Sequence, residues 1–178
     1  MISRRHFLIC AASGLALLNS PRVVARSTLP AERKLKFYNL HTGEHLSAIY
    51  WAEGDYIPSE LAAINKVLRD HRTGKVTKID KRLLEQLFVL QQRVEYAGSY
   101  HIISGYRSPQ TNAGLRHEDN TGVAKRSLHM QGRAVDIRLP GVELKHLRQA
   151  ALKLHSGGVG YYPKSNFIHL DTGRTRFW

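Results

Sequence analysis

The pattern of hydrophobic and polar positions predicts strands near the start of the chain, followed by helices. Alternating runs at 35–39 and 45–51 flank a turn that contains Gly43, which is typical of a β-hairpin. Apolar residues then recur at helical spacing over 58–71 and 80–96. We therefore expect a hairpin followed by two helices that pack as a pair.

The second half of the chain changes to shorter elements that are mostly strands. In chain order we expect a strand over 101–104, a short helix over 108–115, a polar loop over 116–126, a strand over 132–139, a helix over 143–154 and a closing strand pair over 159–162 and 167–171. Helices come early and most strands come late, which indicates an α+β fold. We expect a small, mostly antiparallel sheet with helices packed on one side.

The first residues have the features of an export signal and not of a folded element. Arg4 and Arg5 directly precede an apolar run over 7–18, as in twin-arginine signal peptides, and cleavage is expected near Ala25. We thus divide the chain into a signal at 1–25, a linker at 26–34 and a single domain at 35–178, a size typical of one domain. This predicts a periplasmic protein.

Two other interpretations of the N-terminus exist. A membrane anchor would need about 20 apolar residues, and this run is shorter, so we expect no stable anchor after cleavage. Lipidation of Cys10 would require a small residue before it, and Ile9 is bulky. Cys10 is the single cysteine of the chain, so the cleaved protein has neither disulfides nor thiolate metal ligands.

The chain is strongly basic, which favours polyanionic partners. Its net charge is +13, and the predicted signal contributes Arg4, Arg5 and Arg22 without any acidic residue, leaving +10. No nucleic-acid-binding motif is found, and an exported protein rarely meets nucleic acid. The stem peptides of peptidoglycan carry free carboxylates and are the better-placed partner. Alternatively, the basic side chains simply solvate the surface.

One segment combines residue types that bind metal ions. His129 and Asp136 offer the imidazole and carboxylate groups that Zn²⁺ accepts, and both reach one ion only if the chain bends at Gly132. From Ala134 onward the residues alternate, which places Asp136 on the face opposite Val135. The sequence thus predicts a carboxylate that leaves a strand away from the core.

A second strand supplies two more polar groups on one face. In the run 167–171, His169 and Asp171 alternate with apolar Ile168 and Leu170. His129, Asp136 and His169 therefore provide the three protein ligands that a catalytic zinc site typically uses, leaving Asp171 for chemistry.

Each of these residues also has an ordinary structural interpretation. In that case His129 lies in a loop, Asp136 forms an ion pair with Arg133 or Arg138, and His169 is a hydrogen-bonded core residue.

Three ordered motifs resemble a known group of zinc peptidases. They are Ser104-Gly-Tyr-Arg-Ser108, Ser127-x-His129-x-x-Gly132-x-Ala134-x-Asp136 and Phe167-Ile-His-Leu-Asp171. Together they resemble the peptidases grouped with D-Ala-D-Ala carboxypeptidases, lysostaphin and the Hedgehog signalling domain, and within this group the murein endopeptidases. The resemblance runs from about Gly98 to the end of the sequence. It implies His129, Asp136 and His169 as zinc ligands and Arg107 as the group that binds a substrate carbonyl or carboxylate.

The resemblance also implies hydrolysis of peptide crosslinks in peptidoglycan, including bonds between two diaminopimelate residues. We expect Tyr106 and Ser127 beside Arg107 in substrate binding. The other aromatic residues could line a substrate cleft or pack in the core, and packing is favoured for most of them; they are Tyr161, Tyr162, Phe177 and Trp178. In the related dipeptidases a glutamate three residues before the last zinc-binding histidine is the general base, but here Asn166 occupies that position.

Asp171 is our candidate for the catalytic base, with a role in orienting a histidine as the alternative. The departure at Asn166 also keeps open a catalytically weak or inactive cell-wall-binding module.

Overall fold

The computed structural model describes residues 31–117 and 123–178. The predicted signal peptide and its cleavage site lie outside this part of the chain. The first strand, β1 (Glu32–Asn39), begins inside the segment predicted as a linker.

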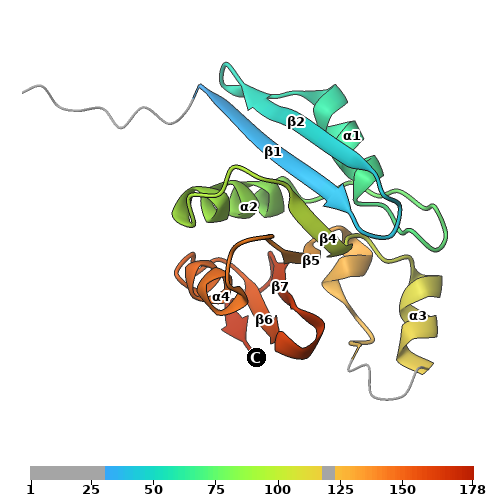
Figure 1. Ribbon diagram of the computed structural model, residues 1–178. Coiled ribbons are helices and arrows are strands. Elements are labelled where there is room, and N and C mark those ends of the chain that lie inside the picture. Colours follow the sequence, from blue (N-terminus) through green and yellow to red (C-terminus); the bar gives the residue numbers. More distant parts are fainter. Residues whose placement is uncertain (1–30, 118–122) are drawn as a thin grey trace, which may run out of the picture.

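One mixed sheet forms the centre of the molecule (Figure 1). Its order is β3-β2-β1-β4-β5-β7-β6-β8. The strands after β1 are β2 (His45–Ala52), β3 (Asp55–Tyr56), β4 (Tyr100–Ser104), β5 (Ala134–Arg138), β6 (Gly158–Tyr162), β7 (Phe167–Asp171) and β8 (Arg176–Phe177). Neighbours are antiparallel except for the pairs β1–β4 and β6–β8. The prediction of a mostly antiparallel sheet is confirmed, but the prediction that it is small is wrong.

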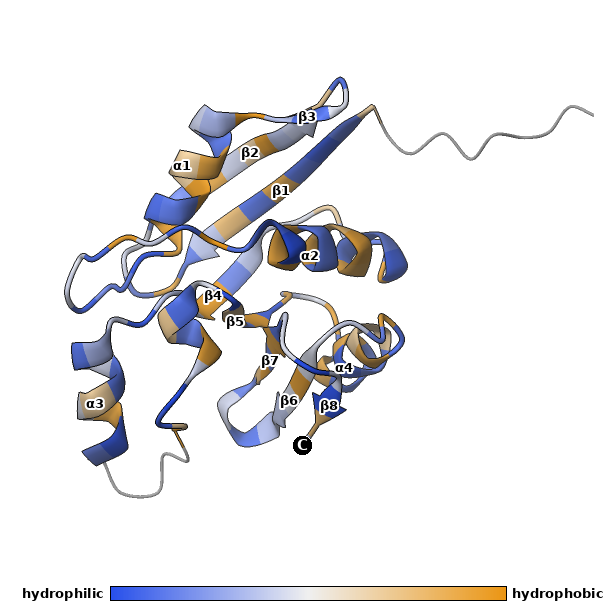
Figure 2. Ribbon diagram, turned by 180° about the vertical axis from the view of Figure 1, so that it is seen from behind, coloured by the Kyte–Doolittle hydropathy of each residue, from blue (hydrophilic) through white to orange (hydrophobic). Residues whose placement is uncertain are grey.

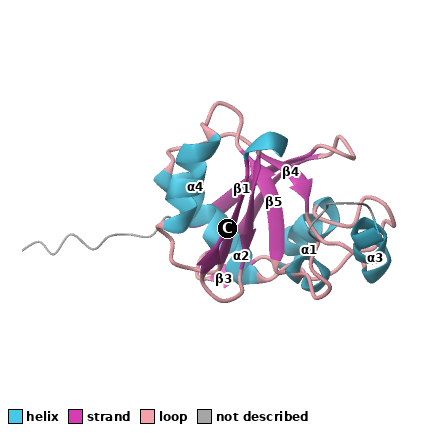
Figure 3. Ribbon diagram, turned by 90° about the horizontal axis from the view of Figure 1, so that it is seen from below, coloured by secondary structure: helices cyan, strands magenta, loops and turns pink. Residues whose placement is uncertain are grey.

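Four α-helices accompany the sheet in the described residues. They are α1 (Pro58–Val67), α2 (Lys81–Arg93), α3 (Pro109–His117) and α4 (Leu144–Leu152). Helix α1 packs mainly on β2, while α2 contacts β1 and α4, so α1 and α2 do not form the predicted pair. Seen from below, α4 and α3 lie at opposite ends of the layer of strands (Figure 3).

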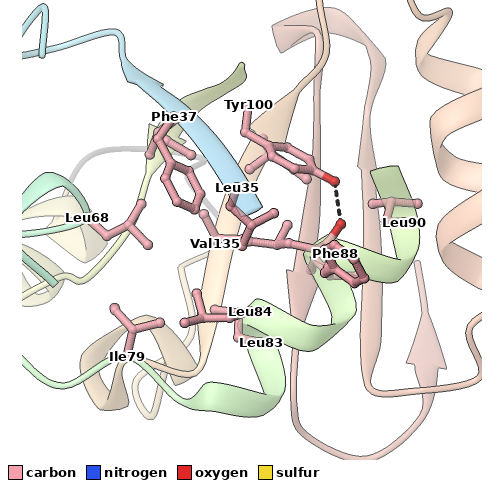
Figure 4. Packing of buried hydrophobic residues seen from close by; sticks show 14 of the residues in the cluster. Leu35, Phe37, Leu68, Ile79, Leu83, Leu84, Phe88, Leu90, Tyr100 and Val135 are labelled. Carbon is pink, nitrogen blue, oxygen red and sulfur yellow. Dashed lines mark hydrogen bonds between the residues drawn. The ribbon is translucent and has the colours of Figure 1, made fainter. Parts of the chain in front are cut away.

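A single apolar cluster joins the strands to α1, α2 and α4. Leu35 and Phe37 of β1 pack with Leu83 and Leu84 of α2, all fully buried (Figure 4). The hydroxyl of Tyr100 enters this cluster and donates a hydrogen bond to the Leu87 carbonyl at 2.7 Å, which removes the cost of burying it. The helices are amphipathic, with polar residues on the side away from this cluster (Figure 2).

The short elements were missed by the sequence analysis. Strands β3 and β8 have two residues each, too few for an alternating pattern to be detected. Within 31–117 and 123–178, no helix is long and apolar enough to cross a bilayer.

Candidate metal centre

A row of directly paired residues crosses four strands on the face of the sheet away from the apolar cluster. Ser104 of β4 pairs with Asp136 of β5, Asp136 pairs with His169 of β7, and His169 pairs with Gly160 of β6. Directly paired residues on adjacent strands point to the same face. The strand register therefore places Asp136 and His169 side by side, although they are far apart in the sequence.

His129 reaches the same place from a 3₁₀ turn, η1 (Leu128–Gln131), that precedes β5. The hydroxyl of Ser127 caps this turn by accepting a hydrogen bond from the His129 amide at 3.3 Å. Gly132 ends it with φ 64°, and a Cβ there would lie 2.3 Å from the Lys78 carbonyl oxygen. The bend predicted at Gly132 is confirmed, and only glycine fits it.

Three potential ligand atoms converge in a buried position. Nε2 of His129 lies 3.2 Å from Nδ1 of His169. Oδ1 of Asp136 lies 2.9 Å from that same Nδ1 and 3.3 Å from Nε2 of His129. The three residues are 2%, 3% and 9% exposed for His129, Asp136 and His169, respectively. The structure thus brings together all three residues that the sequence analysis selected as ligands.

The other ring nitrogens define where the protons are. Nδ1 of His129 lies 2.7 Å from the Gly105 carbonyl oxygen, and Nε2 of His169 lies 2.9 Å from the Asp171 carboxylate. Both of these oxygens accept hydrogen bonds, so both nitrogens carry the proton in a neutral ring. When both rings are neutral, the two facing nitrogens and the Asp136 oxygen present electron pairs to one another. Three electron-pair donors this close together are stabilised by a positive charge, which either a proton or a metal ion can supply.

The pKa shifts follow from this arrangement. Burial lowers the pKa of His129 by more than the neighbouring Asp136 raises it, which favours the neutral ring. Burial also acts to lower the pKa of His169, but hydrogen bonds to Asp136 and Asp171 outweigh it and raise the pKa. Burial acts to raise the pKa of Asp136, yet the two histidines hold it well below its usual value. Without a metal, a proton on His169 compensates the negative charge of Asp136. Two imidazoles and a carboxylate are also a typical set of zinc ligands.

Asp171 lies on the far edge of the His169 ring and is completely buried. Its carboxylate accepts hydrogen bonds from the amides of Gly158 and Gly173 at 3.0 and 2.8 Å, in addition to the one from His169. Arg176 donates two more, at 2.6 and 3.1 Å. Burial acts to raise the pKa of Asp171, but these donors outweigh it and keep the pKa well below the usual carboxyl value. The low pKa favours the charged carboxylate, which contacts His169 on the ring edge away from Asp136.

Arg107 lies next to the three converging residues. Its Nε donates to Ser104 at 2.8 Å, and its guanidinium also pairs with Asp136. The ion pair of Asp136 is therefore with Arg107 and not with Arg133 or Arg138, the neighbours considered from the sequence. Arg133 instead contacts Thr172 and Asp80.

The three converging residues, together with Arg107 and Asp171, line a pocket of about 370 Å³. Its lining comprises Arg107, Val123, Ala124, Arg126, Ser127, Leu128, His129, Asp136, Tyr162, Phe167, His169, Asp171, Arg176 and Trp178. Tyr106, the aromatic residue selected from the sequence, is not part of this lining, and Tyr162, Phe167 and Trp178 are. Packing was favoured for Tyr162 and Trp178 from the sequence, because the place of Trp178 in the pocket depends on the pairing of β8 with β6.

Comparison with known proteins assigns the family. The model of the family described as peptidoglycan L,D-endopeptidase MepK matches residues 27–178. This chain belongs to that family. A relative from Escherichia coli K12 named peptidoglycan L,D-endopeptidase MepK is 45% identical over 167 residues, covering 94% of this chain and 91% of the relative. One from Haemophilus influenzae named probable peptidoglycan L,D-endopeptidase MepK is 40% identical over 168 residues, covering 94% and 89%.

The match confirms the resemblance to murein endopeptidase K within the zinc peptidases. It extends well beyond the three motifs, since it includes β1, β2, α1 and α2 as well as the strands that carry the converging residues.

Proposed function

We propose that this protein is a zinc-dependent endopeptidase that hydrolyses peptide crosslinks in peptidoglycan, with His129, Asp136 and His169 as the metal ligands. The observation that carries the proposal is the buried convergence of two imidazole nitrogens and a carboxylate oxygen, which lie within 3.3 Å of one another. A cell-wall-binding module without catalysis would have no need for such an arrangement at the floor of a pocket.

The chain supplies positioning around the scissile amide. Zinc, when bound at a site of this type, polarises a carbonyl and lowers the pKa of a coordinated water. Arg107 is held at two points, by Ser104 and Asp136, so its guanidinium faces the pocket in a fixed orientation. In the proposed mechanism Arg107 binds the substrate carbonyl and stabilises the negative charge that develops on its oxygen. Ser127 contributes by capping the turn that carries His129.

For Asp171 the geometry supports the orienting role that was considered beside the role of base. Five hydrogen bonds occupy its two oxygens, and the His169 ring separates it from the converging ligand atoms. We propose that Asp171 fixes the tautomer of His169 so that Nδ1 offers its electron pair to the metal. Asn166 is exposed and absent from the pocket lining, so it does not replace the glutamate of the related dipeptidases.

The relatives' names support an L,D peptide bond of peptidoglycan as the substrate. Bonds linking two diaminopimelate residues are the specific candidates that the family resemblance implies, and the basic charge of the protein suits the carboxylates of peptidoglycan in general. We further propose that Arg4 and Arg5 direct export to the periplasm by the twin-arginine route. Replacing both with lysine is expected to leave unprocessed precursor in the cell, and normal processing of this variant would exclude that route.

The proposed function is tested by digesting purified sacculi with the mature protein. Muropeptides released by the zinc-loaded protein are identified by mass spectrometry, with parallel samples containing a chelator and samples in which zinc is restored. We expect release of uncrosslinked stem peptides that is lost with chelator and recovered with zinc. Binding to sacculi without any release would support the cell-wall-binding module instead.

A further inference from the structure

Exposed aromatic side chains gather beside the candidate metal centre. Tyr162, Phe177 and Trp178 are 37%, 70% and 46% exposed, and they are three of the five large hydrophobic residues that are exposed in the described part of the chain. Tyr162 and Trp178 line the pocket, whereas Phe177 does not. Exposed aromatic surface next to a site commonly marks a place where a ligand binds.

Trp178 is held in a fixed position despite this exposure. Its backbone pairs with β6, with the Trp178 amide donating to Val159 at 3.2 Å and the Tyr161 amide donating to Trp178 at 3.0 Å. The indole nitrogen donates to the Tyr162 hydroxyl at 2.8 Å. Arg176 lies 5.0 Å from the ring centroid, at cation–π distance. Side chains that only cover a surface do not need so many restraints.

The Trp178 ring occupies space that is free because position 160 of β6 is a glycine. Gly160 is the member of the cross-strand row that follows His169, and a Cβ there would lie 2.8 Å from the indole ring of Trp178. The Trp178 ring thus lies over Gly160 and beside His169, with ring centroids 5.3 Å apart. The indole ring therefore lines the pocket next to one of the three converging residues.

We propose that Trp178 is a specificity-determining residue that packs against the aliphatic side chain next to the scissile amide. The inference rests on the proposed function and adds which part of the substrate the Trp178 ring contacts. When the scissile amide lies at the converging ligand atoms, the substrate residues on either side of it contact the Trp178 ring, because that ring is next to His169. The glycan lies farther along the stem peptide. Aromatic side chains such as Trp178 supply large contact area at small entropic cost, because few torsions are fixed.

The direct test uses the protein's own fluorescence. The chain has two tryptophans, Trp51 and Trp178, and Trp51 lies on β2, next to Arg33 and apart from the pocket. In the zinc-loaded Trp51→Phe variant, Trp178 is the only tryptophan, so excitation selective for indole reports its emission alone. Stopped-flow mixing with crosslinked peptide dimers freed of their sugars should shift its emission within the first turnover. The Trp178→Phe variant, which keeps Trp51, should show no shift.

Kinetics supply the second test. Trp178→Ala should raise KM for the peptide dimers by about 10- to 100-fold, with little change in kcat and normal zinc content. Trp178→Phe should recover part of this loss. Gly160→Ala, which displaces the ring, should reproduce it. Phe177→Ala is the matched control, because it removes a more exposed neighbour that does not line the pocket, and it should behave as wild type.

Several outcomes would overturn the inference. They are an unchanged KM in Trp178→Ala, loss of zinc in that variant, an equal effect of Phe177→Ala, or an emission shift caused by the free disaccharide and not by the peptide. Failure of the proposed function looks different, since the wild-type protein would then hydrolyse no crosslinked dimer. The emission shift of Trp178 would still report whether the peptide binds against its ring.

Discussion

Strands β5 and β7 carry two contrasting surfaces on their opposite faces. On one face Val135, Ile137, Ile168 and Leu170 are fully buried in the apolar cluster. The other face carries Asp136, His169 and Asp171, which are almost equally buried but polar. Burial of an aliphatic side chain contributes about 1.5–3 kcal/mol to stability, whereas burial of a charged group costs free energy unless it is compensated. The same two strands therefore stabilise the fold through one face and carry, on the other, a buried polar cluster whose negative charge must be compensated.

The largest expected effect comes from removing a ligand on the polar face. His129→Ala should reduce zinc from about one per chain to near zero, because two remaining ligands bind weakly, and turnover on sacculi should become undetectable. Metal analysis and muropeptide release are the measurements. His146→Ala, an exposed histidine of α4, is the control. Full zinc retention in His129→Ala would remove this residue from the ligand set.

The apolar face should respond in the opposite way. Leu170→Ala leaves a cavity in the cluster and should cost about 2–5 kcal/mol of unfolding free energy, while the folded fraction keeps its zinc. Urea unfolding of the zinc-loaded protein, combined with metal analysis, measures both quantities. Loss of zinc without loss of stability would mean that the two faces are not separate in function.

Asp171→Asn should have an intermediate effect on the polar face. An amide in this place turns an N–H group toward Arg176 or toward the amides of Gly158 and Gly173, so His169 loses its fixed orientation. We expect zinc affinity to fall by about 10- to 100-fold, the usual effect of a group that orients a ligand. Competition with a chromophoric chelator measures it, with Asp55→Asn, an exposed carboxylate of β3, as the control. Unchanged affinity together with lost turnover would restore Asp171 as the base.

The smallest effect is expected at a buried carboxylate outside the metal centre. Asp70 accepts hydrogen bonds from the amides of Arg72 and Ser108, at 2.9 and 2.8 Å, and thereby anchors the segment that carries Arg107. Burial acts to raise its pKa, but hydrogen bonds from Thr111, Ser108 and Arg72 hold the pKa well below the usual value. A depressed folded-state pKa stabilises the protein above the unfolded-state value of about 3.9, and this contribution is lost as the pH falls through the folded-state pKa.

Asp70→Asn should therefore cost about 1–3 kcal/mol near pH 7, and the difference from wild type should shrink in acid. Unfolding curves recorded from pH 7 down to acid measure both values. A difference that does not change with pH would mean that Asp70 acts through shape and not through charge.

The features that could be predicted from the sequence are those with a local signal. Alternation in β5 and β7 was enough to place Asp136 and His169 on the polar faces of their strands, and Gly132 indicated the bend after His129. The pairing partner of Asp136 was not predictable, because Arg133 and Arg138 are near in sequence while Arg107 arrives from the turn after β4. The choice between packing and a cleft role for Trp178 could not be made from the sequence for the same reason, since its position depends on the pairing of β8 with β6.

The cross-strand row has a consequence for errors in folding. A slip of one residue between β5 and β7 would exchange the two faces of the slipped strand, placing Asp136 or His169 in the apolar cluster and Ile137 or Ile168 over the pocket. Such a slip would bury an ionisable group without its partners, so it would be penalised far more than a slip in a strand with two similar faces. The chemical asymmetry of β5 and β7 thus disfavours such a slip, because it would disrupt the apolar core and the candidate metal centre together.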